Sequence, residues 1–113
     1  MDSDDDLQAA VQSGCSFALV RVLGVAVDKS GTRSQTTAYA CEVVCSVDQA
    51  SFTASTLKHF GPPLLDVEGT YVVGARDSHR HHGAWELRFA AAAGEPATAV
   101  AEFCARRAAL PIS

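Results

Sequence analysis

Residues 16–28 form an almost uninterrupted apolar run, and this run constrains the fold more than any other segment. Only Arg21 interrupts it before Asp28, which predicts one long strand with both faces largely covered. Gly24 lies inside the run and predicts a bulge or a sharp bend at that point. A long strand bent at a glycine is a feature expected of a small, strongly curved sheet.

Four further strands are predicted at 36–47, 51–59, 70–76 and 84–92. In three of them the apolar residues alternate, so we expect each alternating set to share one face. These sets are Tyr39, Cys41, Val43, Cys45 and Val47; Tyr71, Val73 and Ala75; and Trp85, Leu87, Phe89 and Ala91, with Glu86 and Arg88 opposite the last set.

Two helices are predicted, one at each end of the strands. The first covers residues 3–13, with Ser3 as N-cap, three aspartates in its first turn and Gly14 as a stop. The second covers 96–109, with Pro96 near its first position. Between the third and fourth strands, the Gly61–Pro63 sequence breaks the chain, and residues 64–69 are predicted to form a loop or a single helical turn.

The order helix, five strands, helix predicts a mainly β (α+β) fold. We expect a single domain over residues 1–113, because this length suits one hydrophobic core. Strands over 16–92 predict a five-stranded antiparallel barrel of the oligonucleotide/oligosaccharide-binding (OB) type. A curved sheet wrapped on one helix is the alternative architecture. No apolar run is long enough to span a membrane as a helix.

Three segments together resemble netrin-like domains, the barrel found in tissue inhibitors of metalloproteinases. They are the hairpin from Phe17 to Val47, the Gly69-Thr70-Tyr71-Val72-Val73 strand, and the Trp85–Phe89 strand before the last helix. The resemblance implies a non-catalytic interaction module. Those inhibitors begin with a cysteine that reaches the target's metal, whereas Cys15 here follows fourteen residues. No inhibitory role is therefore carried over.

Four cysteines, Cys15, Cys41, Cys45 and Cys104, leave the redox state open. Cys41 and Cys45 would lie about 13 Å apart on a regular strand, too far for a disulfide. Each is expected to be a small core residue, and pairing with Cys15 or Cys104 is the alternative. The chain opens with acidic residues and shows no signal peptide, so we expect a cytoplasmic location, or an extracytoplasmic one if a leader precedes it.

The net charge is −4, but it comes from the acidic N-terminal residues, and the neutral remainder of the chain argues against a partner that is mainly phosphate backbone. Four of the thirteen acids are Asp2, Asp4, Asp5 and Asp6, and the remaining nine balance the nine bases. A protein partner is therefore the expectation, with the oligomeric state left open. A single-stranded nucleic acid that binds a local basic surface is the alternative.

The fourth and fifth strands and the loop between them form the first predicted binding surface. The candidates there are Arg76, His79, Arg80, His81, His82 and Arg88. The histidines could share a metal with His59, but a loop without cysteine holds ligands poorly, so no native metal or cofactor is expected. Leu64 and Leu65 form a second predicted surface, as exposed apolar residues. No nucleophile elbow, phosphate loop or dinucleotide motif is present, so no enzyme activity is expected.

Overall fold

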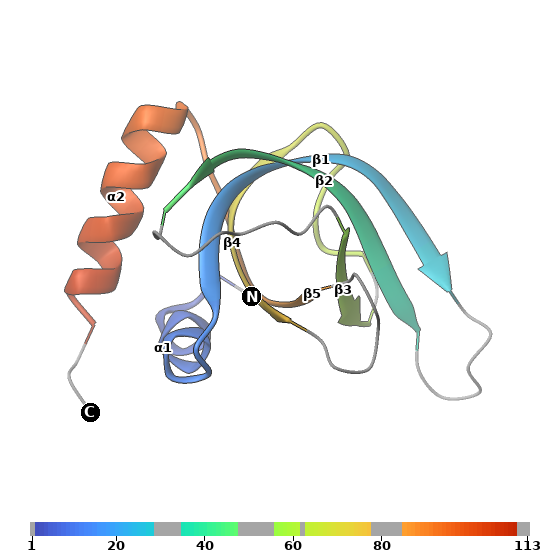
Figure 1. Cartoon of the computed structure of the whole chain (residues 1–113), viewed down its shortest axis with the longest axis horizontal. Coiled ribbons are helices and arrows are strands. Elements are labelled where there is room, and N and C mark those ends of the chain that lie inside the picture. The colour runs from blue at the N-terminus through green and yellow to red at the C-terminus, as the bar shows by residue number, and fades with distance from the viewer. Residues whose placement is uncertain (1, 29–34, 48–55, 62, 78–84, 111–113) are drawn as a thin grey trace.

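The structure is a computed structural model of the whole chain, and it describes residues 2–28, 35–47, 56–61, 63–77 and 85–110. The elements follow the predicted order: α1 (Asp4–Gln12), β1 (Ser16–Asp28), β2 (Thr36–Ser46), β3 (Thr56–Phe60), β4 (Thr70–Asp77), β5 (Trp85–Ala92) and α2 (Pro96–Ala108). The fold is mainly β with two helices, as the sequence predicts (Figure 1). Predicted strand residues 51–55 and 84 lie outside the described residues.

The five strands close in a ring in the order β1-β2-β3-β5-β4, with β4 returning to β1. Four of the neighbouring pairs are antiparallel, but β3 and β5 run parallel, with Leu57 opposite Trp85. The prediction of a wholly antiparallel sheet is therefore wrong. A ring with an odd number of strands cannot alternate direction at every step, so closure forces one parallel pair.

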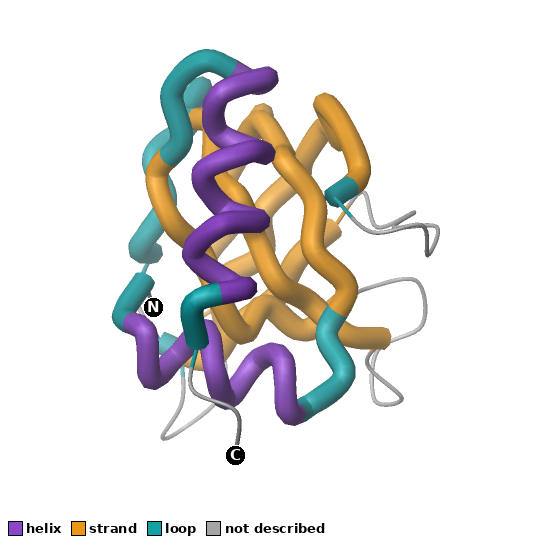
Figure 2. The backbone as a smooth tube through the Cα atoms, turned by 90° about the vertical axis from the view of Figure 1, so that its left-hand side faces the viewer, coloured by secondary structure: helices purple, strands orange, loops and turns teal. Residues whose placement is uncertain are grey.

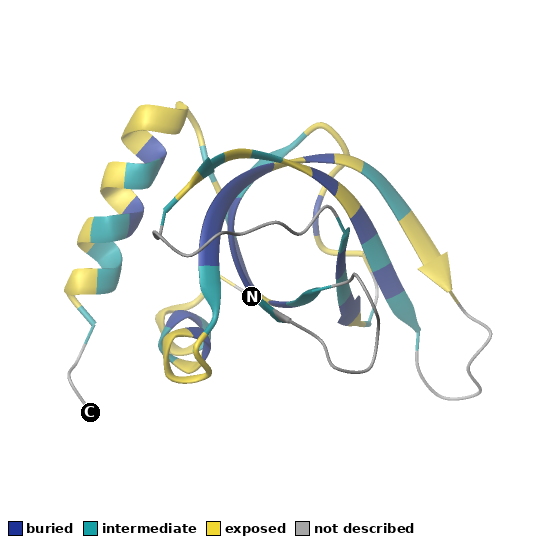
Figure 3. Ribbon diagram, in the orientation of Figure 1, coloured by how far each residue is buried: buried dark blue, intermediate teal, exposed yellow. Residues whose placement is uncertain are grey.

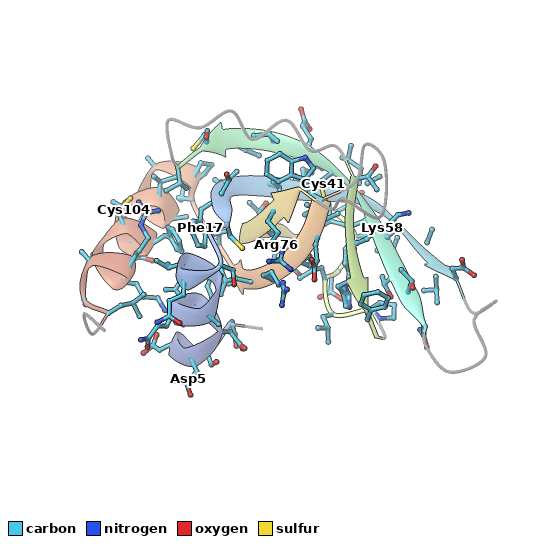
Figure 4. All side chains as sticks on the ribbon, turned by 60° about the horizontal axis from the view of Figure 1, so that its bottom comes forward. Asp5, Phe17, Cys41, Lys58, Arg76 and Cys104 are labelled. Atoms are coloured by element: carbon cyan, nitrogen blue, oxygen red, sulfur yellow. The ribbon has the colours of Figure 1, made fainter. Side chains whose placement is uncertain are left out.

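Apolar side chains form two clusters, one on each side of the curved sheet. The inner cluster fills the ring and includes Val20, Tyr39, Leu57, Val73 and Leu87. The outer cluster lies between the strands and the helices and consists of Leu7, Ala10, Phe17, Leu19, Val72, Phe89, Ala99 and Phe103. Both helices lie on the outside of the ring (Figure 2), and Phe17 of β1 packs against Phe103 of α2 (Figure 4).

Three bulges shift side chains from one cluster to the other. In β2, Val44 is extra between the pairs Leu19–Cys45 and Val20–Val43. Cys45 therefore joins the outer cluster while Val43 packs on the inner one, so these residues do not share a face. A second bulge, at Leu23, confirms the irregularity predicted from Gly24.

The third bulge lies in β5 and changes the predicted face of the fifth strand. Gly74 is opposite Phe89 and Ala75 is opposite Leu87, so Arg88 is the extra residue. Leu87 consequently belongs to the inner cluster and Phe89 to the outer cluster. The prediction that Leu87 and Phe89 share one face is wrong, because one extra residue reverses the alternation beyond it.

The caps of α1 are those that the sequence predicts. The Ser3 hydroxyl accepts a hydrogen bond from the Asp6 N–H at 3.1 Å and donates one to the Asp6 carboxylate at 2.9 Å. The hydrogen bond from Ser3 is the largest cause of a lowered pKa of Asp6. At the other end, Gly14 has a φ of 75°, the left-handed conformation that favours glycine after a helix.

Helix α2 packs through Ala99 and Phe103, both buried, and its last turn carries two arginines. The Arg107 guanidinium lies 5.6 Å from the Phe17 ring centroid, and that of Arg106 lies 5.4 Å from the Phe89 centroid. The Arg106 Nε also donates to the Asp4 carboxylate at 2.9 Å, which links the two helices. Arg106 and Arg107 therefore help to hold α2 against the outer cluster.

Candidate interaction surface

The first predicted surface is only partly within the described residues. Arg76 on β4 and Arg88 on β5 belong to it, whereas His79, Arg80, His81 and His82 lie outside the part of the chain that the structure describes. Arg76 is opposite Glu86 in the β4–β5 ladder, and Arg88 is the bulged residue two positions further along β5. The structure thus brings both described arginines to one place, on either side of Glu86.

Glu86 pairs with both of these arginines. Its Oε2 lies 3.2 Å from the Nε of Arg76, and its Oε1 lies 3.1 Å from the Nε of Arg88. The arginine side chains are 42% and 41% exposed, so each ion pair contributes at most about 1 kcal/mol. The carboxylate nevertheless offsets one of the two positive charges and occupies one donor of each guanidinium. This arrangement weakens the local cationic surface that a phosphate would need.

Among the described residues, most aromatic side chains are buried and do not offer stacking platforms beside these two arginines. Tyr39 and Phe89 are fully buried, and Phe17 and Phe103 are nearly so. Trp85, at the start of β5, packs against the inner cluster. Among the described residues the exposed aromatic side chain is Phe60 on β3, at 64%. Single-strand binders combine a basic track with exposed aromatics, and the described part of this surface does not provide that combination.

The cysteines are all free and lie in different environments. Cys41 faces the ring and Cys104 lies on α2, well apart in Figure 4. Burial raises the pKa of Cys41 to about 11. Burial also raises the pKa of Cys15, although Arg88 and Arg76 nearby act in the opposite direction. Both thiols therefore stay protonated near neutral pH, which removes them as ready nucleophiles.

His59 is part of the ring interior. It is 5% exposed on β3, and its ring stacks on that of Tyr39 with centroids 5.4 Å apart and planes 14° apart. His59, which could have joined the loop histidines as a metal ligand, is buried against Tyr39, and those histidines lie outside the described residues. Within the described ranges, no group of three or more histidines, cysteines or acids could hold a metal ion.

The second predicted surface is held in place by two tyrosine hydroxyls. The Tyr39 hydroxyl accepts hydrogen bonds from the N–H groups of Leu64 at 2.8 Å and Leu65 at 3.4 Å. The Tyr71 hydroxyl accepts one from the Asp66 N–H at 2.9 Å. These bonds fix the β3–β4 connection over one end of the ring.

Of the two predicted leucines, only Leu64 is exposed. Leu64 is 54% exposed, whereas Leu65 is 6% exposed and packs in the inner cluster. The prediction of an exposed Leu65 is wrong, because the backbone N–H groups of Leu64 and Leu65 donate to the Tyr39 hydroxyl and hold the loop with Leu65 against the inner cluster.

Among the described residues, three further large apolar residues are exposed on this connection or on the strands next to it, and none of them was predicted from the sequence. Val67 is 51% exposed, Leu23 55% and Phe60 64%. The N–H of Glu68 donates to the Val22 carbonyl at 2.7 Å, which brings Val67 beside Leu23. Phe60 ends β3 immediately before the same connection. We call Leu23, Phe60, Leu64 and Val67 the apolar end. The β3–β4 connection that carries Leu64 and Val67 is mostly exposed, as Figure 3 shows.

A signal for two of these residues is visible in retrospect. Gly24 marks the bulge, and the extra residue in a bulge departs from the alternation that buries its neighbours. Phe60 precedes the Gly61 chain break, where the strand ends and its outer face is left uncovered. Val67 has no comparable signal, because its exposure depends on the loop conformation that the tyrosines impose.

A shallow pocket lies under α2, lined by Val72, Ala91, Ala93, Phe103 and Arg106 among others. Arg106 supplies its positive charge but is already engaged by Asp4, the Asp2 carbonyl and the Phe89 ring. The positive charge of Arg106 is therefore already used within the chain, and the pocket is poorly suited to bind an anion.

In the part of the chain that the structure describes, neither α1 nor α2 is long and apolar enough to cross a membrane. No family model, curated protein or solved structure matches the chain.

Proposed function

We propose that the chain is a non-enzymatic protein-interaction module that binds its partner through the apolar end. The observation that carries this proposal is the exposure of four large apolar side chains on backbone that is itself held by hydrogen bonds. Preorganised apolar residues lose little entropy on binding, and they gain from leaving water. Leu64 and Val67 lie on one short connection, and exposed apolar residues that gather in this way are a feature of interaction sites.

The fold that we propose for this module is an OB-type barrel, related to the netrin-like domains that the sequence resembles. The five-stranded ring and the long bent β1 support this assignment. The resembling segments correspond to the β1–β2 hairpin, the start of β4, and β5 followed by α2. The OB assignment concerns architecture, and the interaction role rests on the surface residues themselves.

Affinity capture from the cells that produce the protein tests this role. The double variant Leu64→Asp/Val67→Asp places charge on the apolar end, and Val11→Asp is its matched control. Val11 is 41% exposed on α1, so that substitution adds charge at an exposed valine elsewhere. We expect the wild type and Val11→Asp to recover the same partner at 0.5 M salt, where the Debye length is only about 4 Å and exposed charges are largely screened. The double variant should lose that partner. Equal recovery by all three proteins would overturn the proposal.

The alternative is a single-stranded nucleic-acid binder that uses the β4–β5 hairpin. Its support is the position of two half-exposed arginines, Arg76 and Arg88, which lie close together on the strands before and after Arg80 in the sequence. Salt-dependent binding of a short oligonucleotide, weakened by Arg80→Ala and Arg88→Ala, would favour this alternative. Unchanged affinity across a salt series, or no binding, would count against it.

A further inference from the structure

The long strand β1 has a stretch that is paired on one side only. On one edge it pairs with β2 as far as Asp28. On the other edge it pairs with β4 from Ser16 to Arg21, after which Val22 bonds to Glu68 and Gly69. Within the described ranges, no strand pairs with residues 23–27 on that second side. The end of β1 extends past β4 there, toward the right of Figure 1.

The hydrogen bonds of Val22 fix which backbone groups face this edge. Its N–H donates to the Gly69 carbonyl at 3.0 Å, and its carbonyl accepts from Glu68, so both groups point away from β2. Residues in an antiparallel ladder face alternate sides. With Leu23 as the extra residue, Gly24 and Ala26 bond toward β2. The N–H and carbonyl groups of Val25 and Val27 therefore point to the open edge.

The side chains along this edge are apolar and its surroundings are acidic. Residues 23–27 carry no charge, and Leu23 and Val27 are 55% and 40% exposed. Proteins usually protect an open edge with charges or proline, and this stretch has neither. Asp28 follows the stretch in sequence, and Asp66 and Glu68 lie on the connection that bonds to Val22. All three of these acidic residues are exposed.

We propose that residues 23–27 of β1 bind an extended peptide segment by strand addition, and that this segment alternates apolar residues and carries basic residues at its ends. The edge-facing backbone groups of Val25 and Val27 can bond to the backbone of an extended peptide. The exposed side chains of Leu23 and Val27 can contact apolar side chains of that peptide. The flanking carboxylates select positive charge at the segment's ends. This inference rests on the proposed interaction role and names the class of partner.

A second copy of the chain fits this edge less well. In an antiparallel twofold pairing centred on Val25, Asp28 of each copy would lie opposite Val22 of the other, next to Glu68. Like charges would thus meet at both ends of the pairing. Five paired residues also span only about 17 Å, too short to approach the roughly 1,000 Å² of a stable interface by themselves.

The test uses a defined peptide, acetyl-Lys-Val-Thr-Val-Thr-Val-Lys-amide, and the full chain labelled for NMR. We expect peptide at saturation to slow amide hydrogen exchange of Val25 and Val27 by about tenfold or more, because each N–H gains an acceptor. Exchange in α2 should stay unchanged. A peptide with proline in place of both threonines cannot form the ladder and should not slow these amides.

Variants then separate backbone pairing from side-chain contact. Val27→Pro removes one edge-facing N–H, a change that edge strands tolerate, and should weaken binding about tenfold, as expected for one lost hydrogen bond. Val27→Thr keeps the backbone and should stay within about twofold. Asp28→Lys should weaken binding of the Lys-flanked peptide and strengthen that of a Glu-flanked one. Spectra of each variant without peptide confirm that it is folded.

Two results would overturn strand addition. In the first, the peptide binds but exchange at Val25 and Val27 is unchanged. In the second, neither the Lys-flanked nor the Glu-flanked peptide binds at millimolar concentration. Neither result decides the interaction role, which the capture experiment with Leu64→Asp/Val67→Asp tests independently. Loss of that role would instead appear as equal capture by all proteins in that experiment.

Discussion

Gly74 on β4 lies directly under the ring of Phe17. A Cβ atom added at Gly74 would come within 2.6 Å of Cε1 of Phe17, and Phe17 also packs 5.1 Å, centroid to centroid, from Phe103 of α2. The ring therefore has little room to retreat. Because Gly74 has no side chain, Phe17 can lie close to β4 and still pack against Phe103 of α2.

We predict that Gly74→Ala lowers the free energy of unfolding by about 1–3 kcal/mol, the usual cost of overpacking. Gly94→Ala is the matched control, because a Cβ there meets nothing within 4 Å. That control should change stability by less than about 0.5 kcal/mol. Urea unfolding followed by circular dichroism measures both, and equal effects of the two variants would contradict the packing that we describe.

The Cys41 thiol is the group whose protonation is linked most clearly to folding. Burial raises its pKa from 9.0 to about 11, and the thiol donates weakly to the Tyr39 carbonyl at 3.8 Å. The unfolded chain therefore loses this proton at lower pH than the folded chain does. The stabilising contribution is complete below pH 9 and is lost as the pH rises toward 11.

We accordingly expect a difference between the wild type and Cys41→Ala in how stability depends on pH. The wild type should lose stability more steeply between pH 9 and about 11. At pH 8, alkylation of Cys41 in the folded chain should be about a hundredfold slower than that of an unperturbed thiol, in proportion to its thiolate fraction. Mass spectrometry after timed alkylation measures this rate. A Cys41 that is modified as fast as in the urea-unfolded chain would refute its burial.

At the scale of single residues, the sequence was informative about Cys41 and Ser3 but not about Leu65. Cys41 is a core residue because it alternates with Tyr39, and Ser3 is a cap because of its spacing from Asp6. Leu64 and Leu65 are chemically identical neighbours. Their different exposure depends on the distant Tyr39 hydroxyl, a contact that no local pattern contains.

At the scale of elements, the connection between β3 and β4 depends on the hydroxyl groups of two strand tyrosines. Tyr39→Phe removes the acceptor for the N–H groups of Leu64 and Leu65. We predict a loss of about 1–3 kcal/mol, since partly buried donors are left unpaired. Amide exchange at Leu64 and Leu65 should accelerate, whereas exchange at Phe103 in α2 should follow only the global loss of stability. Unchanged exchange at the two leucines would contradict this role for Tyr39.

The bulges set the limit of prediction for the strands. The existence and order of all five strands follow from alternation and chain breaks, and Gly24 correctly marks one irregularity. The bulges at Val44 and Arg88 have no glycine beside them in their own strands. They arise from fitting both faces of a curved sheet to two clusters, which is a property of the packed molecule.

At the scale of the whole molecule, closure of the ring explains the mixed sheet and places the end of β3 beyond its parallel contact with β5. Five strands close only with one parallel pair, which is β3 with β5. The parallel contact extends over Leu57 and Lys58, so Phe60 at the end of β3 lies beyond it. The sequence predicted the mainly β class and the two flanking helices, but a pattern of alternating residues holds no information on how strands are ordered around a ring.

The two candidate surfaces differ in their chemical character. The arginines of the β4–β5 hairpin are partly neutralised by Glu86, while the apolar end has four exposed side chains on constrained backbone. These differences led us to place the interaction site at the apolar end. The two surfaces can be compared directly because each offers an exposed position for a chemical probe.

Site-specific photo-crosslinking in living cells makes that comparison. A photoreactive amino acid at Val67 probes the apolar end, one at Arg88 probes the β4–β5 hairpin, and one at the exposed Glu102 of α2 is the control. We predict a discrete protein adduct from position 67 and none from position 88 or 102. Adducts from position 88 alone, with protein or with nucleic acid, would contradict our assignment of the interaction surface.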